Sequence, residues 1–349
     1  MKKKYIFIGL GIFLILFLII AGNNDQDNKP TINQNDSTAK GWIEYENNPI
    51  IKYKDTILNI LWNDPSVIKE GDIYKMWLSG GDPFAKKIVI KLYYATSKDG
   101  INWNIKKEPI LEPSEAQWDS ESIETPSVIK VGDTYHMYYT GYDDDFKKAI
   151  YSIGHATSKD GISWVKDPNN PIIKPHDDPL KWGFYTTAEP GIVYHNNKFY
   201  LYYASAKSNY PEPGTPFGIM VATSDDGSTF TNNQIAYTLT SSYDSTTYRG
   251  YSTPAVYVNG NIFYLYHDVV YNPDGFDQIA ISSAKSLNGF NFEELETNIF
   301  TINNGDWKDK SVLAPSVLQD ENIIKIWFAG QTEKPEFNYG IGYAYKKND

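Results

Sequence analysis

Five prolines recur at a nearly constant interval, and the residues before them are the first candidates for chemistry. The prolines are spaced 61, 64, 64 and 61 residues apart: Pro65, Pro126, Pro190, Pro254 and Pro315. The preceding residues are, in the same order, Asp64, Thr125, Glu189, Thr253 and Ala314. Two carboxylates held close together in a partly dry site can carry out acid/base hydrolysis of an acetal. Asp64 and Glu189 are therefore the candidate catalytic residues.

Other interpretations of these acids exist. An Asp before a proline is a common turn residue, so Asp64 alone could serve only to start a strand. The recurrence of a carboxylate at the same repeat position, in Glu189, favours a function. Glu124 is a third candidate, one residue before the repeat position that Thr125 holds. Because such a shift turns a side chain to the opposite face of a regular strand, we expect Glu124 to join the other acids only where the backbone is irregular.

Four further residues are candidate substrate contacts on the same side of the repeat. Arg249 is the only arginine in the chain, and a guanidinium can bind vicinal hydroxyls or pair with a loop acid. Asp268 is expected in a loop after a second strand. The neighbouring His267 replaces an aromatic residue of the other copies and is expected to be buried. Trp118 and Trp182 lie eight residues before a repeat proline, which favours a structural role or a platform for a sugar ring.

The segments around the prolines are copies of one unit, such as DPSVIKEGDIYKMWLSG from Asp64 and TPSVIKVGDTYHMYYTG from Thr125. Each copy predicts a short strand, a turn rich in Gly, Asn and Asp, and an alternating aromatic strand. A third strand, a turn such as SKDG and an outer strand complete most copies. We therefore predict an all-β, five-bladed β-propeller with four-stranded antiparallel blades, whose inner strands begin at one funnel.

The two ends of the repeat region predict how the ring closes. The fifth copy stops at Tyr345 without a fourth strand. Near the start, GWIEYENNPIIKY matches SWVKDPNNPIIKP of the second copy, with the same spacing from Trp42 to Pro49 as from Trp164 to Pro171. We expect residues 42–51 to supply the outer strand of the last blade.

The first 40 residues differ from the rest. Residues 1–22 combine three lysines with an apolar run, which is typical of a signal peptide or an N-terminal membrane anchor. Residues 23–40 have almost no apolar side chains, which predicts a disordered linker. The propeller domain would then occupy 41–349 in an extracytoplasmic location, secreted or anchored to the outer face of the cytoplasmic membrane. The chain has no cysteine, so this domain would be stable without disulfides.

The composition of the chain argues against several classes of binding partner. The formal net charge is −11 and no basic cluster is present, which argues against nucleic acid and against membrane contact beyond the N-terminal segment. The sequence has no metal-ligand motif and no phosphate loop, so we expect no metal and no cofactor, although a structural cation in the channel is compatible with it. We expect a monomer that binds a carbohydrate substrate.

The repeat pattern, with Asp in NDPSV and Glu in AEPG, resembles the five-bladed glycosidases that include arabinanases, β-xylosidases, levansucrases, invertases and glycoside hydrolase family 43. The resemblance covers residues 41–349 and implies hydrolysis of plant- or microbe-derived oligo- or polysaccharide. It implies Asp64 as general base, or as nucleophile in a retaining enzyme, and Glu189 as general acid. Members usually have Asp where this chain has Thr125. Glu124 would then be the third acid, which tunes pKa values or orients the sugar.

Three alternatives accompany this interpretation. Mannoside phosphorylases share the propeller, but binding free phosphate usually takes several cationic groups, and the single Arg249 argues against that class. A carbohydrate-binding propeller without turnover on the cell surface is a second alternative, since Glu124 is displaced. A propeller that mediates protein contacts at the cell surface is the third.

Overall fold

The computed structural model describes residues 41–52, 60–83, 85–144, 150–176, 178, 181–207, 217–239, 248–271, 278–303, 307–332 and 338–347. Within these ranges the regular elements are all β-strands, as the repeat pattern predicts. The same ranges contain no helix long and apolar enough to cross a membrane. Residues 1–40, with the predicted export segment and linker, lie outside the described residues.

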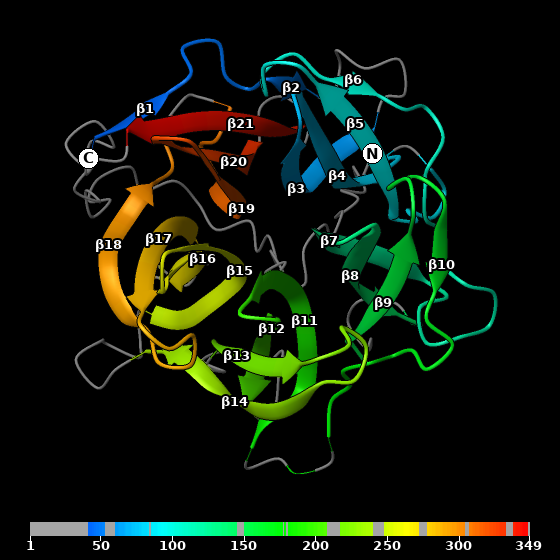
Figure 1. Ribbon diagram of the computed structural model, residues 1–349. Coiled ribbons are helices and arrows are strands. Elements are labelled where there is room, and N and C mark those ends of the chain that lie inside the picture. Colours follow the sequence, from blue (N-terminus) through cyan, green and yellow to red (C-terminus); the bar gives the residue numbers. More distant parts are fainter. Residues whose placement is uncertain are drawn as a thin grey trace, which may run out of the picture.

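The strands form antiparallel sets arranged in a ring about a common centre (Figure 1). The innermost strands are β3 (Leu61–Glu70), β7 (Ser122–Val131), β11 (Trp182–His195), β15 (Tyr248–Asn259) and β19 (Ser311–Asp320). The second strands are β4 (Ile73–Gly81), β8 (Thr134–Tyr142), β12 (Lys198–Lys207), β16 (Ile262–Tyr271) and β20 (Ile323–Thr332). The third strands are β5 (Lys91–Ser97), β9 (Ser152–Ser158), β13 (Phe217–Ser224), β17 (Gln278–Ser286) and β21 (Asn338–Lys347). We number the sets from unit 1, which starts with β3, to unit 5, which starts with β19.

Outer strands complete the sets. Units 1 to 4 end with β6 (Asn104–Ile105), β10 (Trp164–Lys166), β14 (Thr231–Thr238) and β18 (Glu293–Phe300). Units 3 and 4 are joined in one sheet by a single parallel pair between Phe217 and Gly250. A Cβ on Gly250 would lie 2.1 Å from the Phe217 carbonyl oxygen, so only glycine allows this contact.

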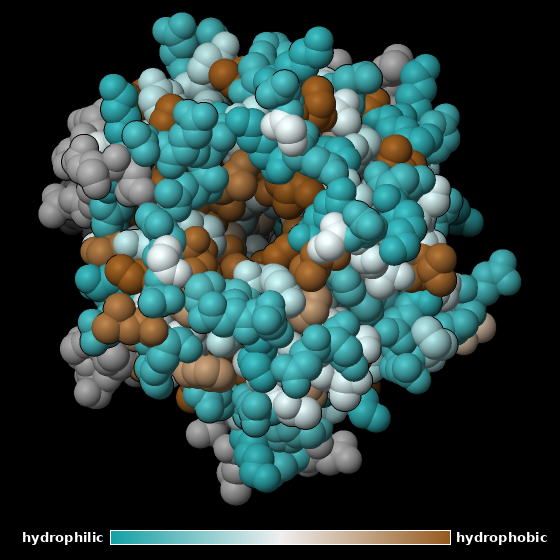
Figure 2. All heavy atoms as spheres, in the orientation of Figure 1, coloured by the Kyte–Doolittle hydropathy of each residue, from teal (hydrophilic) through white to brown (hydrophobic). Residues whose placement is uncertain are grey.

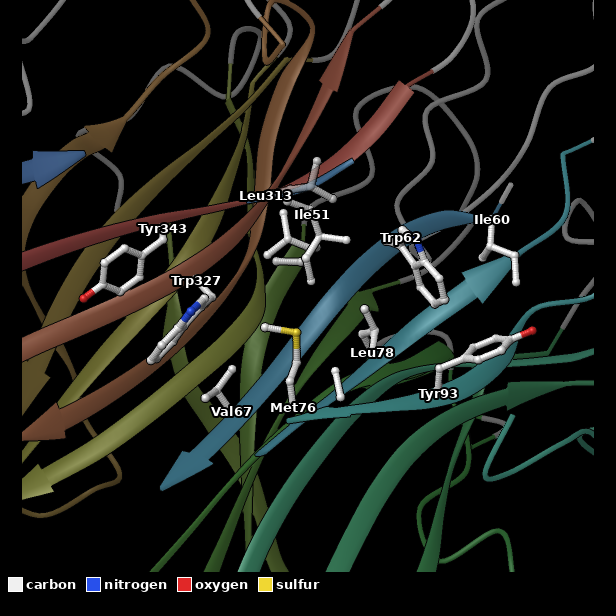
Figure 3. Close-up of a cluster of buried hydrophobic side chains, with 14 of the residues drawn as sticks. Ile51, Ile60, Trp62, Val67, Met76, Leu78, Tyr93, Leu313, Trp327 and Tyr343 are labelled. Carbon is white, nitrogen blue, oxygen red and sulfur yellow. The ribbon is translucent and has the colours of Figure 1, made fainter. Parts of the chain in front are cut away.

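The outer position of unit 5 is taken by the start of the described chain. β1 (Trp42–Glu44) and β2 (Ile51–Lys52) both pair antiparallel with β21, which is the pairing that the Trp42-to-Pro49 match predicts. The Trp42 ring is fully buried and meets the rings of Tyr266 and Phe300 edge-on. Ile51 joins the cluster of buried apolar side chains between units 5 and 1 that Figure 3 shows. The first and last strands are thereby held together by hydrogen bonds and by apolar packing.

Repeated turns connect neighbouring units. In the segment from Ser97 to Gly100, the Ser97 hydroxyl bonds to Asp99, and the Gly100 amide bonds back to Ser97. The Gly100 carbonyl then accepts the indole N–H of Trp327 from unit 5. Second-strand aromatic residues make the same bond at three other junctions, through Trp77 to Gly161, Tyr138 to Gly227 and Tyr202 to Gly289. These turns, three of sequence S-x-D-G and one of sequence S-x-N-G, therefore hold neighbouring units together at four of the five junctions.

Candidate active site

All five residues that precede the repeat prolines have a left-handed backbone conformation. Their φ angles lie between 46° and 53°, at Asp64, Thr125, Glu189, Thr253 and Ala314. Such angles cost roughly 1–3 kcal/mol each in non-glycine residues, so the surrounding structure must impose them. Ala314 has the same conformation as the acids. The conformation is therefore a feature of the ring's architecture and is not specific to the acidic residues.

A β-bulge at each proline produces this conformation. Asn63 pairs with Ser79 and Ser66 pairs with Trp77, so Asp64 and Pro65 together lie opposite the single residue Leu78. The same two-against-one register occurs in the other four units. Proline cannot donate a ladder hydrogen bond and is tolerated in strands at bulges. Strict alternation of faces therefore does not hold where the inner strands meet the funnel.

Oxygen atoms of one unit bind the backbone of the next around the ring. Ser79 Oγ accepts the Thr125 amide at 2.9 Å, and Thr140 Oγ1 accepts the Glu189 amide at 2.8 Å. Asp268 Oδ1 accepts the Ala314 amide at 3.0 Å. Sequence reasoning missed Ser79 and Thr140 and named Asp268 only as a candidate substrate contact, although all three lie two residues after the aromatic second-strand residue, which was a usable signal.

Asp64 is a buried carboxyl, and one of its two oxygens has no hydrogen-bond partner in the part of the chain that the structure describes. Only 4% of the residue is exposed, and Oδ2 has no hydrogen-bond partner among the described residues. Burial raises the pKa of Asp64 to about 6, although hydrogen bonds from the Ser79 hydroxyl and the Thr125 amide act in the opposite direction. A carboxyl with a pKa in this range can take or give a proton near neutral pH.

The raised pKa of Asp64 predicts a pH dependence of stability. The folded protein binds this proton more tightly than the unfolded chain, so stability is lost as the pH rises from about 4 to about 6. As the pH rises through this window, we expect the free energy of unfolding of Asp64→Asn to increase by about 3 kcal/mol relative to that of the unmodified protein. Urea unfolding of both proteins at pH 4 and pH 7 measures the change, and an equal difference at the two pH values contradicts it.

Glu189 lies on the next but one unit and is equally buried. Its Oε2 atom accepts the Thr253 amide at 3.0 Å. This is the bond that Ser79 and Thr140 make in units 1 and 2, whereas unit 3 has Ala204 at the matching second-strand position. The small Ala204 side chain leaves this bond to the Glu189 carboxylate.

Asp268 lies within β16, opposite Ser252, and not in the loop that the sequence predicts. It is 1% exposed. Burial and the charges of Glu189 and Asp64 raise its pKa well above the usual range, against hydrogen bonds from Thr253 and the Ala314 amide. Asp268 therefore belongs to the same electrostatic cluster as the two predicted catalytic acids.

The register also corrects the position of His267. The aromatic second-strand position is filled by Tyr266, which pairs with Ala255 as Trp77 pairs with Ser66. His267 is buried, as predicted, and burial lowers its pKa to about 4.

The third acid was expected to carry a carboxyl and to line the channel. Glu124 has the first of these properties and Thr125 has the second. Thr125 lines the channel, and its hydroxyl is 2.6 Å from that of Thr140. Glu124 is buried beside it, off the channel wall. Burial, and then the charges of Asp64 and Glu124, raise the pKa of Tyr339, so both carboxylates act on the same tyrosine. The backbone at this point is irregular, which is the condition under which Glu124 was expected to approach the other acids.

The remaining candidates have different settings. Arg249 belongs to β15, four residues before Thr253, and its side chain lies outside the described residues. Trp118 stacks on Tyr139, with ring centroids 5.8 Å apart, and covers Gly141. Trp182 covers Gly218 in the same manner. Neither tryptophan lines the channel. A Cβ on Gly141 would clash with the Trp118 ring, and one on Gly218 would lie only 3.0 Å from the Trp182 ring, so both rings pack closely against the backbone. Their contact with a sugar stays a prediction.

Asp64 and Glu189 lie at one end of a channel between the five inner strands. Its cavity of about 230 Å³ is bounded by the inner strands from the pre-proline residues onward, and its wall continues through Val67, Val128, Val193, Val256 and Val317. Figure 2 shows hydrophobic side chains around the hollow at the centre of the molecule. The described wall contains Asp64 and Glu189 and no Lys, Arg or His. Among the described residues, no group of three or more His, Asp or Glu could hold a metal ion.

Comparisons with known proteins agree with a carbohydrate-active fold. The family model of beta-1,4-mannooligosaccharide phosphorylase (glycoside hydrolase family 130) matches residues 84–150. A 1,2-beta-oligomannan phosphorylase of Thermoanaerobacter sp. (strain X514) is 38% identical over 86 residues, which is 24% of this chain and 28% of that protein. A beta-1,2-mannobiose phosphorylase of the same strain is 28% identical over 110 residues, 28% of this chain and 35% of that protein. The matches thus span about a third or less of these relatives.

Solved structures resemble the whole ring. A protein described as a glycoside hydrolase has a TM-score of 0.67 at 14% identity and covers 82% of this chain and 88% of its own. A thermostable family-43 glycoside hydrolase has a TM-score of 0.63 at 16% identity, with 81% and 89% covered. The beta-1,2-mannobiose phosphorylase of Listeria innocua has a TM-score of 0.62 at 15% identity, with 88% and 96% covered. The chain therefore has an all-β glycoside hydrolase fold of the propeller type.

The local sequence matches include the phosphorylase class that the single arginine argued against. The segment matched by the family model contains Glu124 and Thr125 but neither Asp64 nor Glu189. The likeness to family 43 is one of fold.

Proposed function

We propose that this protein is a five-bladed propeller enzyme that hydrolyses β-linked manno-oligosaccharides with Asp64 and Glu189 as its acid/base pair. The carbohydrate class is supported by the mannoside-acting relatives. The segment from Lys2 to Ala21 supports an extracytoplasmic site of action.

The observation that carries the proposal is the grouping of buried carboxyls from different units at one end of the channel. Asp64 and Glu189 line the channel, Asp268 binds the amide of the channel residue Ala314, and each of the three acids is at least nine-tenths buried. Carboxyls are costly to bury unless each has a function or a partner, and pairs with different environments serve as acid and base in glycoside hydrolysis.

The roles follow from the chemistry of the reaction. Glu189 donates a proton to the glycosidic oxygen as the bond from this oxygen to the anomeric carbon breaks. Asp64 accepts a proton from a water molecule whose oxygen bonds to that carbon. Asp64 Oδ2 is buried and has no hydrogen-bond partner among the described residues, so it has a free lone pair to accept this proton. Solvent then returns a proton to Glu189 and removes one from Asp64.

Water is favoured over phosphate as the attacking group. The described channel wall presents carboxylates and no cationic side chain, and this field repels a phosphate dianion. Phosphorolysis is the reaction of the mannoside phosphorylases that resemble this chain, so it is the competing outcome.

The choice between water and phosphate predicts the product. Incubation with β-1,2- or β-1,4-mannobiose should release free mannose at the same rate with and without about 10 mM inorganic phosphate, a concentration above the usual range of KM values. Anion-exchange chromatography separates mannose from mannose 1-phosphate. Formation of mannose 1-phosphate that requires added phosphate would assign phosphorolysis instead.

A further inference from the structure

Asp268 is a carboxyl at a position where the hydrogen bonds between units require only a hydroxyl. At the matching second-strand position, units 1 and 2 use the hydroxyls of Ser79 and Thr140 to hold the next unit's amide. Asp268 makes the corresponding bond to the Ala314 amide with a carboxyl. A neutral hydroxyl performs the structural task twice, so the architecture does not account for an additional buried acid.

The position of this acid places it next to Glu189. The Glu189 carboxylate accepts the Thr253 amide at 3.0 Å. Asp268 forms a hydrogen bond with the Thr253 side chain. Two carboxyls from neighbouring units thus bind to one threonine, and both are almost completely withdrawn from water. Two carboxyls in such a site cannot both ionise readily, because each charge opposes the other at low dielectric.

We propose that Asp268 is a positioning residue that shares one proton with Glu189 across Thr253, and so keeps a proton available to Glu189 at the pH at which the enzyme works. The inference rests on the proposed function. The acid that tunes the pKa of Glu189 then lies on the second strand of unit 4. The resemblance to five-bladed glycosidases placed such an acid in unit 2, at the position that Thr125 occupies in this chain. Burial and the Glu189 charge act on Asp268 in the direction that the sharing requires.

The other ionisable side chains that the structure describes around Asp268 do not replace this partner. Asp64 of β3 adds a further negative charge. His267, its neighbour on β16, has a pKa lowered to about 4 by burial and is therefore neutral at working pH. Across the sheet, Asp268 lies opposite Ile281 of β17, and the amide it binds on β19 belongs to Ala314. On β15, Arg249 is the charged residue, with a side chain outside the described residues.

The test is a titration of Glu189 in the full-length protein. Glutamate labelled with ¹³C at the carboxyl carbon reports protonation by infrared spectroscopy, and the Glu189 signal is the one that disappears in Glu189→Gln. We expect Asp268→Asn to lower the midpoint of the Glu189 titration by roughly 1–3 pH units, since a neighbouring negative charge is removed. The basic limb of the pH profile of kcat/KM should move in the same direction by a similar amount.

Two variants separate this role from a structural one. Asp268→Ser copies the Ser79 arrangement, retains an acceptor for the Ala314 amide, and should shift the Glu189 midpoint as Asp268→Asn does. Asp320→Asn removes one charge at the opposite end of β19, where Asp320 pairs with Lys69 and Lys325, and should leave the midpoint unchanged. An unchanged Glu189 midpoint in folded Asp268→Asn and Asp268→Ser overturns the inference. A shifted midpoint in a protein that cleaves no glycoside supports proton sharing and refutes the proposed function.

Discussion

Replacing Asp64 by Asn or Glu189 by Gln is expected to lower the rate of glycoside cleavage by about 10²–10⁴-fold each, with the fold retained. Asn and Gln keep the shape of the side chain but cannot take or give the proton. In Asp64→Asn, an amide nitrogen could lie where Asp64 now presents an oxygen without a partner, so the water would lose its acceptor. Steady-state rates with mannobiose, together with melting temperatures, measure both effects.

The two variants should differ in their dependence on the leaving group. A sugar leaving group needs the proton from Glu189, whereas an activated aryl group leaves without one. The loss in Glu189→Gln should therefore be much smaller on an aryl mannoside, while Asp64→Asn should be impaired on both substrates. Glu124→Gln should cost less than either, because Thr125 holds the channel wall at this point. Equal losses for the two acids on every substrate would refute the assigned roles.

Removal of the N-terminal strands should strongly destabilise the domain. A chain that begins at residue 41 keeps β1 and β2, whereas one that begins at residue 53 leaves β21 as an exposed edge. The shorter chain loses the buried Trp42 and Ile51 side chains, and a Trp-sized loss alone costs about 3–5 kcal/mol. We expect a melting temperature lower by at least roughly 5 °C, with aggregation through the open edge.

A point substitution provides a matched control for the truncation. Trp42→Ala removes the fully buried ring, while Ile43→Ala changes its neighbour, which is 48% exposed. Only the first should lower the melting temperature appreciably. If the two truncated chains melt at the same temperature, the pairing of β1 and β2 with β21 does not stabilise the ring.

The strands could be predicted from the sequence because the units repeat the same local signals. Gly71, Gly132 and Gly260 occupy the left-handed positions of the inner hairpins, and alternating aromatic residues follow them. The match between the segments from Trp42 and Trp164 was sufficient for the pairing of β1, since both place a tryptophan at the start of an outer strand.

The site was harder to predict because it depends on the bulges. Regular alternation places Glu124 and Thr125 on opposite faces, but Thr125 and Pro126 together oppose Tyr139. The proline in the interior of each inner strand was the available signal, since it leaves a ladder bond unmade. Asp268 was assigned to a loop for a related reason. The register shows that it matches Ser79 and Thr140, and sequence spacing alone does not reveal which amide a second-strand side chain will bind.

Turnover by the purified protein is the most direct test of the central claim that the channel acids cleave a glycosidic bond. The full-length protein is incubated with a panel of β-linked manno-oligosaccharides, with and without phosphate, beside Asp64→Asn and Glu189→Gln at equal concentration. We predict that free mannose accumulates only with the unmodified protein and does not depend on phosphate. Binding of these oligosaccharides without release of sugar, in either buffer, would contradict the claim.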